Sequence, residues 1–135
     1  MDKFVKNFIG ASIFYLVLSA VLGTLMLAYP QLMNLKFVHS HLNMLGWVSM
    51  MIYGVGYHIL PRFVGKKLKS NLLGEIQFYL ANAGLVGMLV FYSAAQYNPE
   101  PVYKTLTVVS GIAEAVSVVI FFYNMIATLY AEDAA

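Results

Sequence analysis

The stretch FVHSHLNMLGWVSMMIYGVGYHIL, residues 37–60, decides the fold class, because it is long and contains no Lys, Arg, Asp or Glu. About 20 predominantly apolar residues are enough for a helix to cross the hydrocarbon core of a bilayer. Similar apolar stretches occupy residues 4–29, 71–92 and 103–130. Only 10% of the 135 residues are charged and 61% are hydrophobic, whereas roughly a quarter are charged in a soluble domain. We therefore predict an all-α integral membrane protein with four transmembrane helices in a single domain, residues 1–135.

Basic residues are distributed unevenly between the predicted loops. One side of the membrane would hold most of them: Lys3, Lys6, Arg62, Lys66, Lys67 and Lys69. The other side would hold Lys36 and Lys104. Because short loops rich in Lys and Arg stay cytoplasmic, both termini are predicted to be cytoplasmic, and residues 37–42 to lie near the outer surface.

Composition also limits the chemistry. The chain has no cysteine, which excludes disulfides, thiolate metal ligands, a thiol nucleophile and haem attached through cysteine. The net charge of +2 is too small to indicate a nucleic-acid partner. Histidine, methionine and carboxylate side chains remain as candidates for chemistry.

Polar residues inside a predicted span are functional candidates, because a bilayer tolerates few of them. The densest group is His39, His41 and Asn43 at the outer end of residues 37–60. His39 and His41 project about 200° apart around a helix axis, so they cannot ligate one metal from the same regular helix. His58 lies roughly 28 Å from His39 along the helix and is interpreted as interfacial. A bis-histidine site therefore requires a second copy of the chain, most simply in a homodimer.

Other positions in the spans leave alternatives open. Gly46, Ser49, Gly54 and Gly56 predict a flat trough that suits either close helix packing or a planar ring. Glu114 is either a protonated acid bonded across a helix interface or part of a proton path, with Asn82 as its expected partner. Glu75 and Gln77 are expected to pair with lysines or to face water.

Residues 39–62 resemble the second transmembrane helix of subunit I of the haem-copper oxidases and the related nitric oxide reductases. The resemblance rests on His39 near the outer end and on the run from Gly54 to Pro61, GVGYHILP, with Pro61 expected to end the helix. The His-x-His pattern is also similar to a motif of NnrS-type membrane haem proteins. The chain contains only 3 histidines, so it lacks the ligands of a complete oxygen- or nitric oxide-reducing centre.

The resemblance implies a haem b site at the outer side of a prokaryotic plasma membrane. His39 is the first candidate axial ligand and His41 the second; Trp47, Met50 and Tyr53 are expected to wall the haem, with Asn43 beside it and its propionates near Lys36 or Lys104. One-electron transfer with a quinone or a cytochrome as redox partner is expected, with no catalytic residue predicted. The alternatives are a gas-binding haem protein, a copper or zinc site built by His39 and His41 across subunits, and a membrane scaffold or assembly subunit without redox chemistry.

Overall fold

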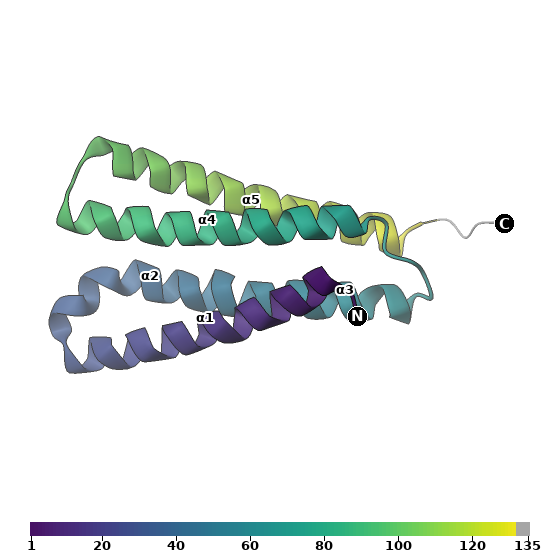
Figure 1. Cartoon of the computed structure of the whole chain (residues 1–135), viewed down its shortest axis with the longest axis horizontal. Coiled ribbons are helices and arrows are strands. Elements are labelled where there is room, and N and C mark those ends of the chain that lie inside the picture. The colour runs from purple at the N-terminus through teal and green to yellow at the C-terminus, as the bar shows by residue number, and fades with distance from the viewer. Residues whose placement is uncertain (132–135) are drawn as a thin grey trace.

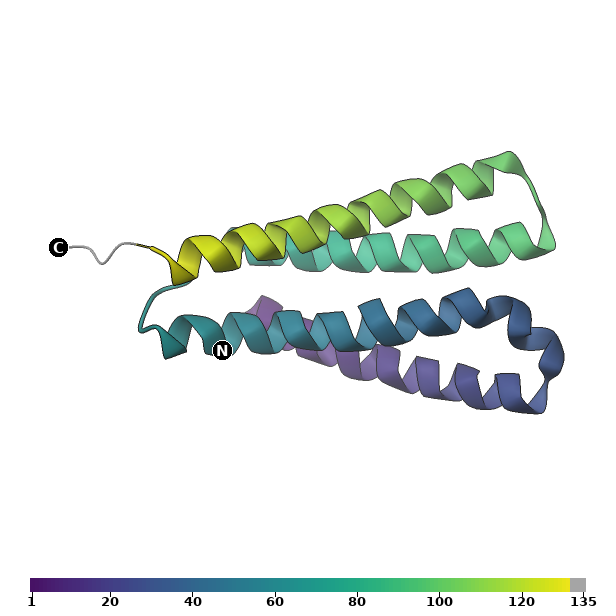
Figure 2. The ribbon, with the colours of Figure 1, turned by 180° about the vertical axis from the view of Figure 1, so that it is seen from behind.

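The computed structural model describes residues 1–131; residues 132–135, which the single-domain prediction also covers, lie outside the described part. The described residues form two helical hairpins that lie side by side (Figure 1). The first hairpin starts with α1 (Lys3–Ala28), and the 3₁₀-helix η1 (Pro30–Leu35) connects it to a second arm. The second hairpin pairs α4 (Asn71–Tyr97) with α5 (Pro101–Leu129). Both hairpin connections lie at one end of the molecule, the η1 end, and the view from behind shows the same arrangement (Figure 2).

The second arm of the first hairpin is helical throughout but changes its hydrogen-bond pattern. It consists of α2 (Lys36–His41), the π-helical segment η2 (Leu42–Ser49) and α3 (Met50–Phe63). In η2 the Ser49 hydroxyl also donates to the Met44 carbonyl, five residues earlier, at 2.8 Å. Wide turns of this kind are rare and occur often at functional sites. Here the wide turns follow directly after the two histidines.

Three helices are long and apolar enough to cross a membrane. The most apolar 18-residue stretch has a mean hydropathy of 2.1 in α1, 1.5 in α4 and 2.0 in α5. The structure therefore confirms an all-helical architecture for residues 1–131, consistent with a multi-pass membrane protein. The α2–η2–α3 arm lies beside them, and its crossing of the membrane is part of the proposal below.

Two predicted helix boundaries are wrong. Pro61 does not end the second arm but lies inside the last turn of α3. The chain leaves the helix instead at Gly65, whose φ of 67° is accessible to glycine without a steric penalty. The predicted linker of residues 93–102 is also shorter, because α4 continues to Tyr97 and α5 already begins at Pro101. Proline is favoured at the first position of a helix, where its missing N–H has no partner to lose.

Side chains of the same chain fill the predicted trough. A Cβ on Gly46 would lie 2.8 Å from the Tyr15 side chain, and a Cβ on Gly54 would lie 2.7 Å from Ile9. A Cβ on Gly56 would lie 3.2 Å from the Phe121 ring. Of the two alternatives left open by the sequence, close helix packing is thus the one found in this chain.

Candidate functional site

His39 is held between the two arms of the first hairpin. Its Nδ1 atom lies 3.1 Å from the Ser19 carbonyl oxygen, and its Nε2 atom lies 3.3 Å from the Asn43 amide nitrogen. The ring rests against Gly23, where an added Cβ would lie 2.8 Å from His39 Cε1. A carbonyl can only accept, so Nδ1 carries the proton, and Nε2 accepts from the Asn43 side chain. His39 and Asn43 are therefore brought together as the sequence grouped them.

His41 faces a different neighbour. Its Nδ1 atom lies 2.9 Å from the Phe37 carbonyl oxygen, one helical turn earlier. Its ring stacks on the Phe37 ring at a centroid distance of 3.8 Å, and Phe37 in turn stacks on Tyr92 of α4 at 4.0 Å. His39 thus contacts α1 while His41 belongs to a stack that leads to α4. The prediction that these imidazoles project in different directions is confirmed.

Both imidazoles carry the Nδ1 proton and leave a lone pair on Nε2. An Nδ1–H donated to a backbone carbonyl orients the ring and fixes this tautomer, as in most histidines that bind metals through Nε2. Within residues 1–131, His41 Nε2 makes no hydrogen bond, whereas His39 Nε2 is occupied by Asn43. His41 therefore offers the more accessible ligand atom.

His58 has a different environment at the opposite end of the arm. Its Nδ1 atom accepts a hydrogen bond from Arg62 at 2.6 Å. Arg62 also donates to the His58 carbonyl oxygen. This local pairing near the basic loop agrees with the interfacial interpretation of His58.

The expected haem-wall residues do not share one environment. Met50 is fully buried and Tyr53 is 5% exposed, and both belong to the hydrophobic core. The Tyr53 ring packs against Phe8 and Phe121, at centroid distances of 5.5 Å and 4.8 Å. Trp47, in contrast, is 37% exposed. Within one chain, Met50 and Tyr53 therefore act as core residues, and Trp47 alone is available to an external group.

The expected pairing of Glu114 with Asn82 is wrong. Asn82 Oδ1 accepts from the Tyr15 hydroxyl at 2.7 Å, and its amide nitrogen donates to the Phe78 carbonyl at 2.7 Å. Glu114 is 4% exposed, and neither of its carboxyl oxygens has a partner within residues 1–131. Asn82 faces α1, where it bonds to Tyr15. Glu114 instead lies at the close contact between α4 and α5, where its backbone nitrogen is next to Gly84.

Gln77 also differs from its expected environment. It neither faces water nor pairs with a lysine. Its side chain is fully buried, and its Oε1 atom accepts a hydrogen bond from the Tyr57 hydroxyl at 2.7 Å. Glu75 is exposed, as expected. The helical register brings Gln77 toward the core and turns Glu75 outward.

Metal ligands are sparse in the described part of the chain. Residues 1–131 contain no group of three or more His, Asp or Glu side chains able to hold a metal ion together. A copper or zinc site within one chain is therefore not supported. Any site using His39 or His41 must take further ligands from elsewhere.

Sequence reasoning missed the residues that position the histidines. Ser19 and Gly23, two small residues four positions apart in α1, together hold the His39 ring. This contact could have been predicted from the short connection at η1. In a helical hairpin, residues at equal distances from the turn lie opposite each other on the two arms. Phe37 and Tyr92, in contrast, carried no signal, since Tyr92 joins the stack from the second hairpin.

Comparison with known proteins identifies no relative from which a function could be transferred. No protein-family model matches the chain, and no curated protein matches it significantly. Its function is therefore inferred from the arrangement of its own side chains.

Proposed function

We propose that the chain is a membrane-bound b-type haem protein whose axial ligand is a histidine of the His39-Ser40-His41 run. The observation that supports this proposal is the anchoring of both Nδ1 atoms on backbone carbonyls, at 3.1 Å for His39 and 2.9 Å for His41. This arrangement leaves Nε2 as the unprotonated ring nitrogen, and a haem iron binds an unprotonated nitrogen of imidazole.

His41 is the first ligand in this proposal, which reverses the order expected from the sequence. Its Nε2 is without a partner, whereas His39 would have to release the Asn43 amide at 3.3 Å. Phe37 orients the His41 ring through both its carbonyl group and its aromatic face. His39 remains the second ligand candidate, and Asn43 controls access to it.

A second copy of the chain completes the site in this proposal. The His39-Ser40-His41 run of one chain offers a single Nε2 atom without a hydrogen bond, and side chains of the same chain fill the glycine trough. Trp47 and Met44 are 37% and 60% exposed and belong to the same arm as His41. They would contact a haem held between two arms related by a twofold axis, as in isologous dimers. Lys36 and Lys104 are at the η1 end, where propionate groups need basic partners.

The haem would supply one-electron transfer when both of its axial positions are filled by imidazole. The protein would orient the imidazoles through Ser19 and Phe37 and limit water with apolar side chains. With one axial position open, the same site would bind nitric oxide or oxygen instead. Glu114 and Asn82 do not interact with each other, so a proton path through both would need a bridging group.

The proposal includes four crossings of the bilayer. The α2–η2–α3 arm lies beside three helices able to span a membrane, and the basic loop after α3 lies at the same end of the molecule as the N-terminus (Figure 1). Both termini would then face the cytoplasm of a prokaryote. The redox partner would be a quinone or a cytochrome.

A second candidate function is a packing or assembly subunit without a cofactor. It is favoured by the close fit of Gly46 and Gly54 against α1, which leaves no flat surface for a ring within one chain. In this case His39 and His41 would serve only to fix the geometry of the η1 end.

Absorption spectra of the detergent-purified protein, oxidised and reduced, test the proposal together with a pyridine haemochrome assay. We expect a Soret band, a sharp reduced α band and about half a haem per chain for one bis-histidine haem in a dimer. His41→Ala should abolish haem binding, whereas His58→Ala is the matched control and should retain it. A colourless protein from haem-replete cells, or full haem retention in both His39→Ala and His41→Ala, would overturn the proposal.

A further inference from the structure

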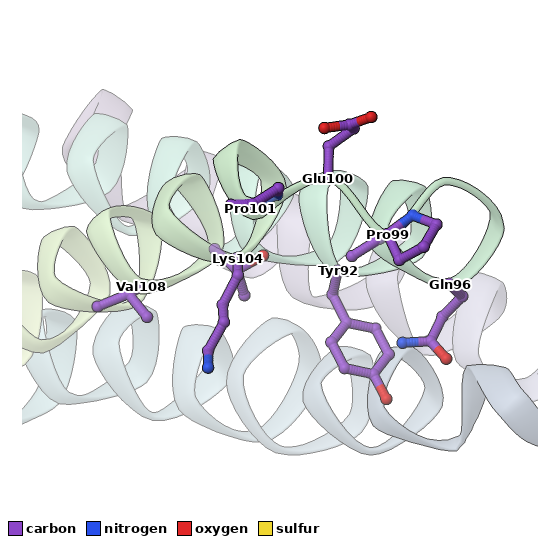
Figure 3. A pocket seen from close by; sticks show the side chains of 9 residues that line it. Tyr92, Gln96, Pro99, Glu100, Pro101, Lys104 and Val108 are labelled. Carbon is purple, nitrogen blue, oxygen red and sulfur yellow. The ribbon is translucent and has the colours of Figure 1, made fainter.

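Lys104, one of the two candidate propionate partners of the proposed haem, also lines a hollow at the η1 end. The hollow has a volume of about 370 Å³ and lies between the end of α4 and the start of α5 (Figure 3). Its floor is mainly apolar, from residues such as Ala95, Pro101 and Val108. The polar side chains in its lining are those of Tyr92, Gln96, Thr107, Glu100 and Lys104.

Three donor groups in this hollow extend to the same side. The side chains of Tyr92, Gln96 and Lys104 point away from the α4–α5 connection in one direction, whereas Glu100 points in the opposite direction (Figure 3). Within residues 1–131, the hydroxyl, amide and ammonium groups of these three side chains make no hydrogen bond, and Lys104 forms no ion pair. The hollow thus combines apolar walls with donors that have no acceptor.

We propose that this hollow binds an anionic phospholipid, with the lipid phosphate on Lys104. A phosphate oxygen accepts a charge-assisted hydrogen bond from an ammonium group, which is stronger than a bond between neutral groups. Gln96 and Tyr92 supply further hydrogen-bond donors to the same lipid headgroup. A neutral carbonyl ligand would leave the Lys104 charge uncompensated.

The position of the hollow fits a lipid. It lies where α5 begins at Pro101, at the end of a helix able to span the membrane, which is the depth of lipid headgroups. Below it, Val108 and Ile112 are 55% and 58% exposed and lie one helical turn apart on the same face of α5. They provide an apolar path for one acyl chain that continues from the hollow.

The test measures lipids retained by the detergent-purified protein, using native mass spectrometry after addition of phosphatidylglycerol, phosphatidylcholine or diacylglycerol with identical acyl chains. We expect preferential retention of one phosphatidylglycerol per chain. Lys104→Met should weaken it about tenfold, equivalent to about 1.4 kcal/mol, because a charge-assisted hydrogen bond is lost. Lys67→Met removes the same charge at the opposite end and should leave retention unchanged.

Three results would overturn this proposal. Equal retention of diacylglycerol would mean that the phosphate is not recognised. An equal effect of Lys67→Met would mean that net charge, rather than the hollow, attracts the lipid. Loss of haem from Lys104→Met without loss of phosphatidylglycerol would assign Lys104 to a haem propionate instead. Haem content is measured separately from lipid retention, so the two proposals can fail independently.

Discussion

The two hairpins solve the problem of packing polar residues among apolar helices in different ways. In the first hairpin the arm after η1 is irregular, and its inward polar groups are hydrogen-bonded, as His39 is to Ser19 and Asn43. In the second hairpin α4 and α5 are regular, and small residues bring their backbones together at Gly84. Yet this regular hairpin contains Glu114, a buried carboxyl group with no partner in residues 1–131. The first hairpin therefore satisfies its inward polar groups with hydrogen bonds, whereas the second leaves the Glu114 carboxyl group without a partner in the described residues.

Gly84→Ala should cause the largest loss of stability, because it disturbs the close contact between α4 and α5. A Cβ at this position would lie 2.7 Å from the Glu114 backbone nitrogen and 2.9 Å from the Ser110 carbonyl oxygen. Backbone atoms cannot move without displacing the whole helix, so we expect a loss of about 2–3 kcal/mol in the free energy of unfolding. Unfolding in mixed detergent micelles, followed by circular dichroism, measures it.

Gly111→Ala is the matched control on the same helix pair. An added Cβ there would meet only the Met88 sulfur at 3.8 Å, which is an ordinary contact distance. Stability should stay the same or rise slightly, because alanine favours the helix more than glycine does. Equal losses for Gly84→Ala and Gly111→Ala would show that α4 and α5 are not held by close contact at Gly84.

Glu114→Met tests whether the second hairpin is destabilised by its buried carboxyl group. Methionine has an unbranched side chain of similar length and no polar atom that requires a hydrogen bond. Burying a polar group without a partner costs about 1–3 kcal/mol, so we expect a gain in the free energy of unfolding of up to that amount. The same detergent unfolding experiment gives the value.

Glu75→Met provides the comparison, because Glu75 is exposed on α4. It should change stability by less than about 0.5 kcal/mol, as most surface substitutions do. A clear loss of stability in Glu114→Met would contradict the expectation. It would indicate that the carboxyl group has a partner in the assembled protein, such as a second chain or a bound group.

The sequence predicts the architecture better than the site for physical reasons. Length and apolar composition are properties of each segment, so α1, α4 and α5 follow from the sequence to within a few residues of the observed bounds, except at the end of α4. The divergence of His39 and His41 also follows, because both lie within one short helix. The hydrogen-bond partners of the polar side chains cannot be predicted from the sequence in this way. Asn82 bonds to Tyr15 rather than Glu114, because rotation of each helix about its axis depends on glycine contacts such as Gly46 against Tyr15.

Tyr15→Phe addresses one of the hydrogen bonds that connect the two hairpins, and apart from the controls its effect should be the smallest. The Tyr15 hydroxyl donates to Asn82 Oδ1 at 2.7 Å, across α1 and α4. Hydrogen bonds between helices in membranes contribute about 0.6 kcal/mol on average, because the separated helices also find partners for their polar groups. A double-mutant cycle with Asn82→Leu, measured by unfolding and by fluorescence of the single Trp47, isolates this coupling. Additive losses would show that Tyr15 and Asn82 contribute independently. The hydrogen bond from Tyr57 to Gln77 and apolar packing would then hold the first hairpin against the second.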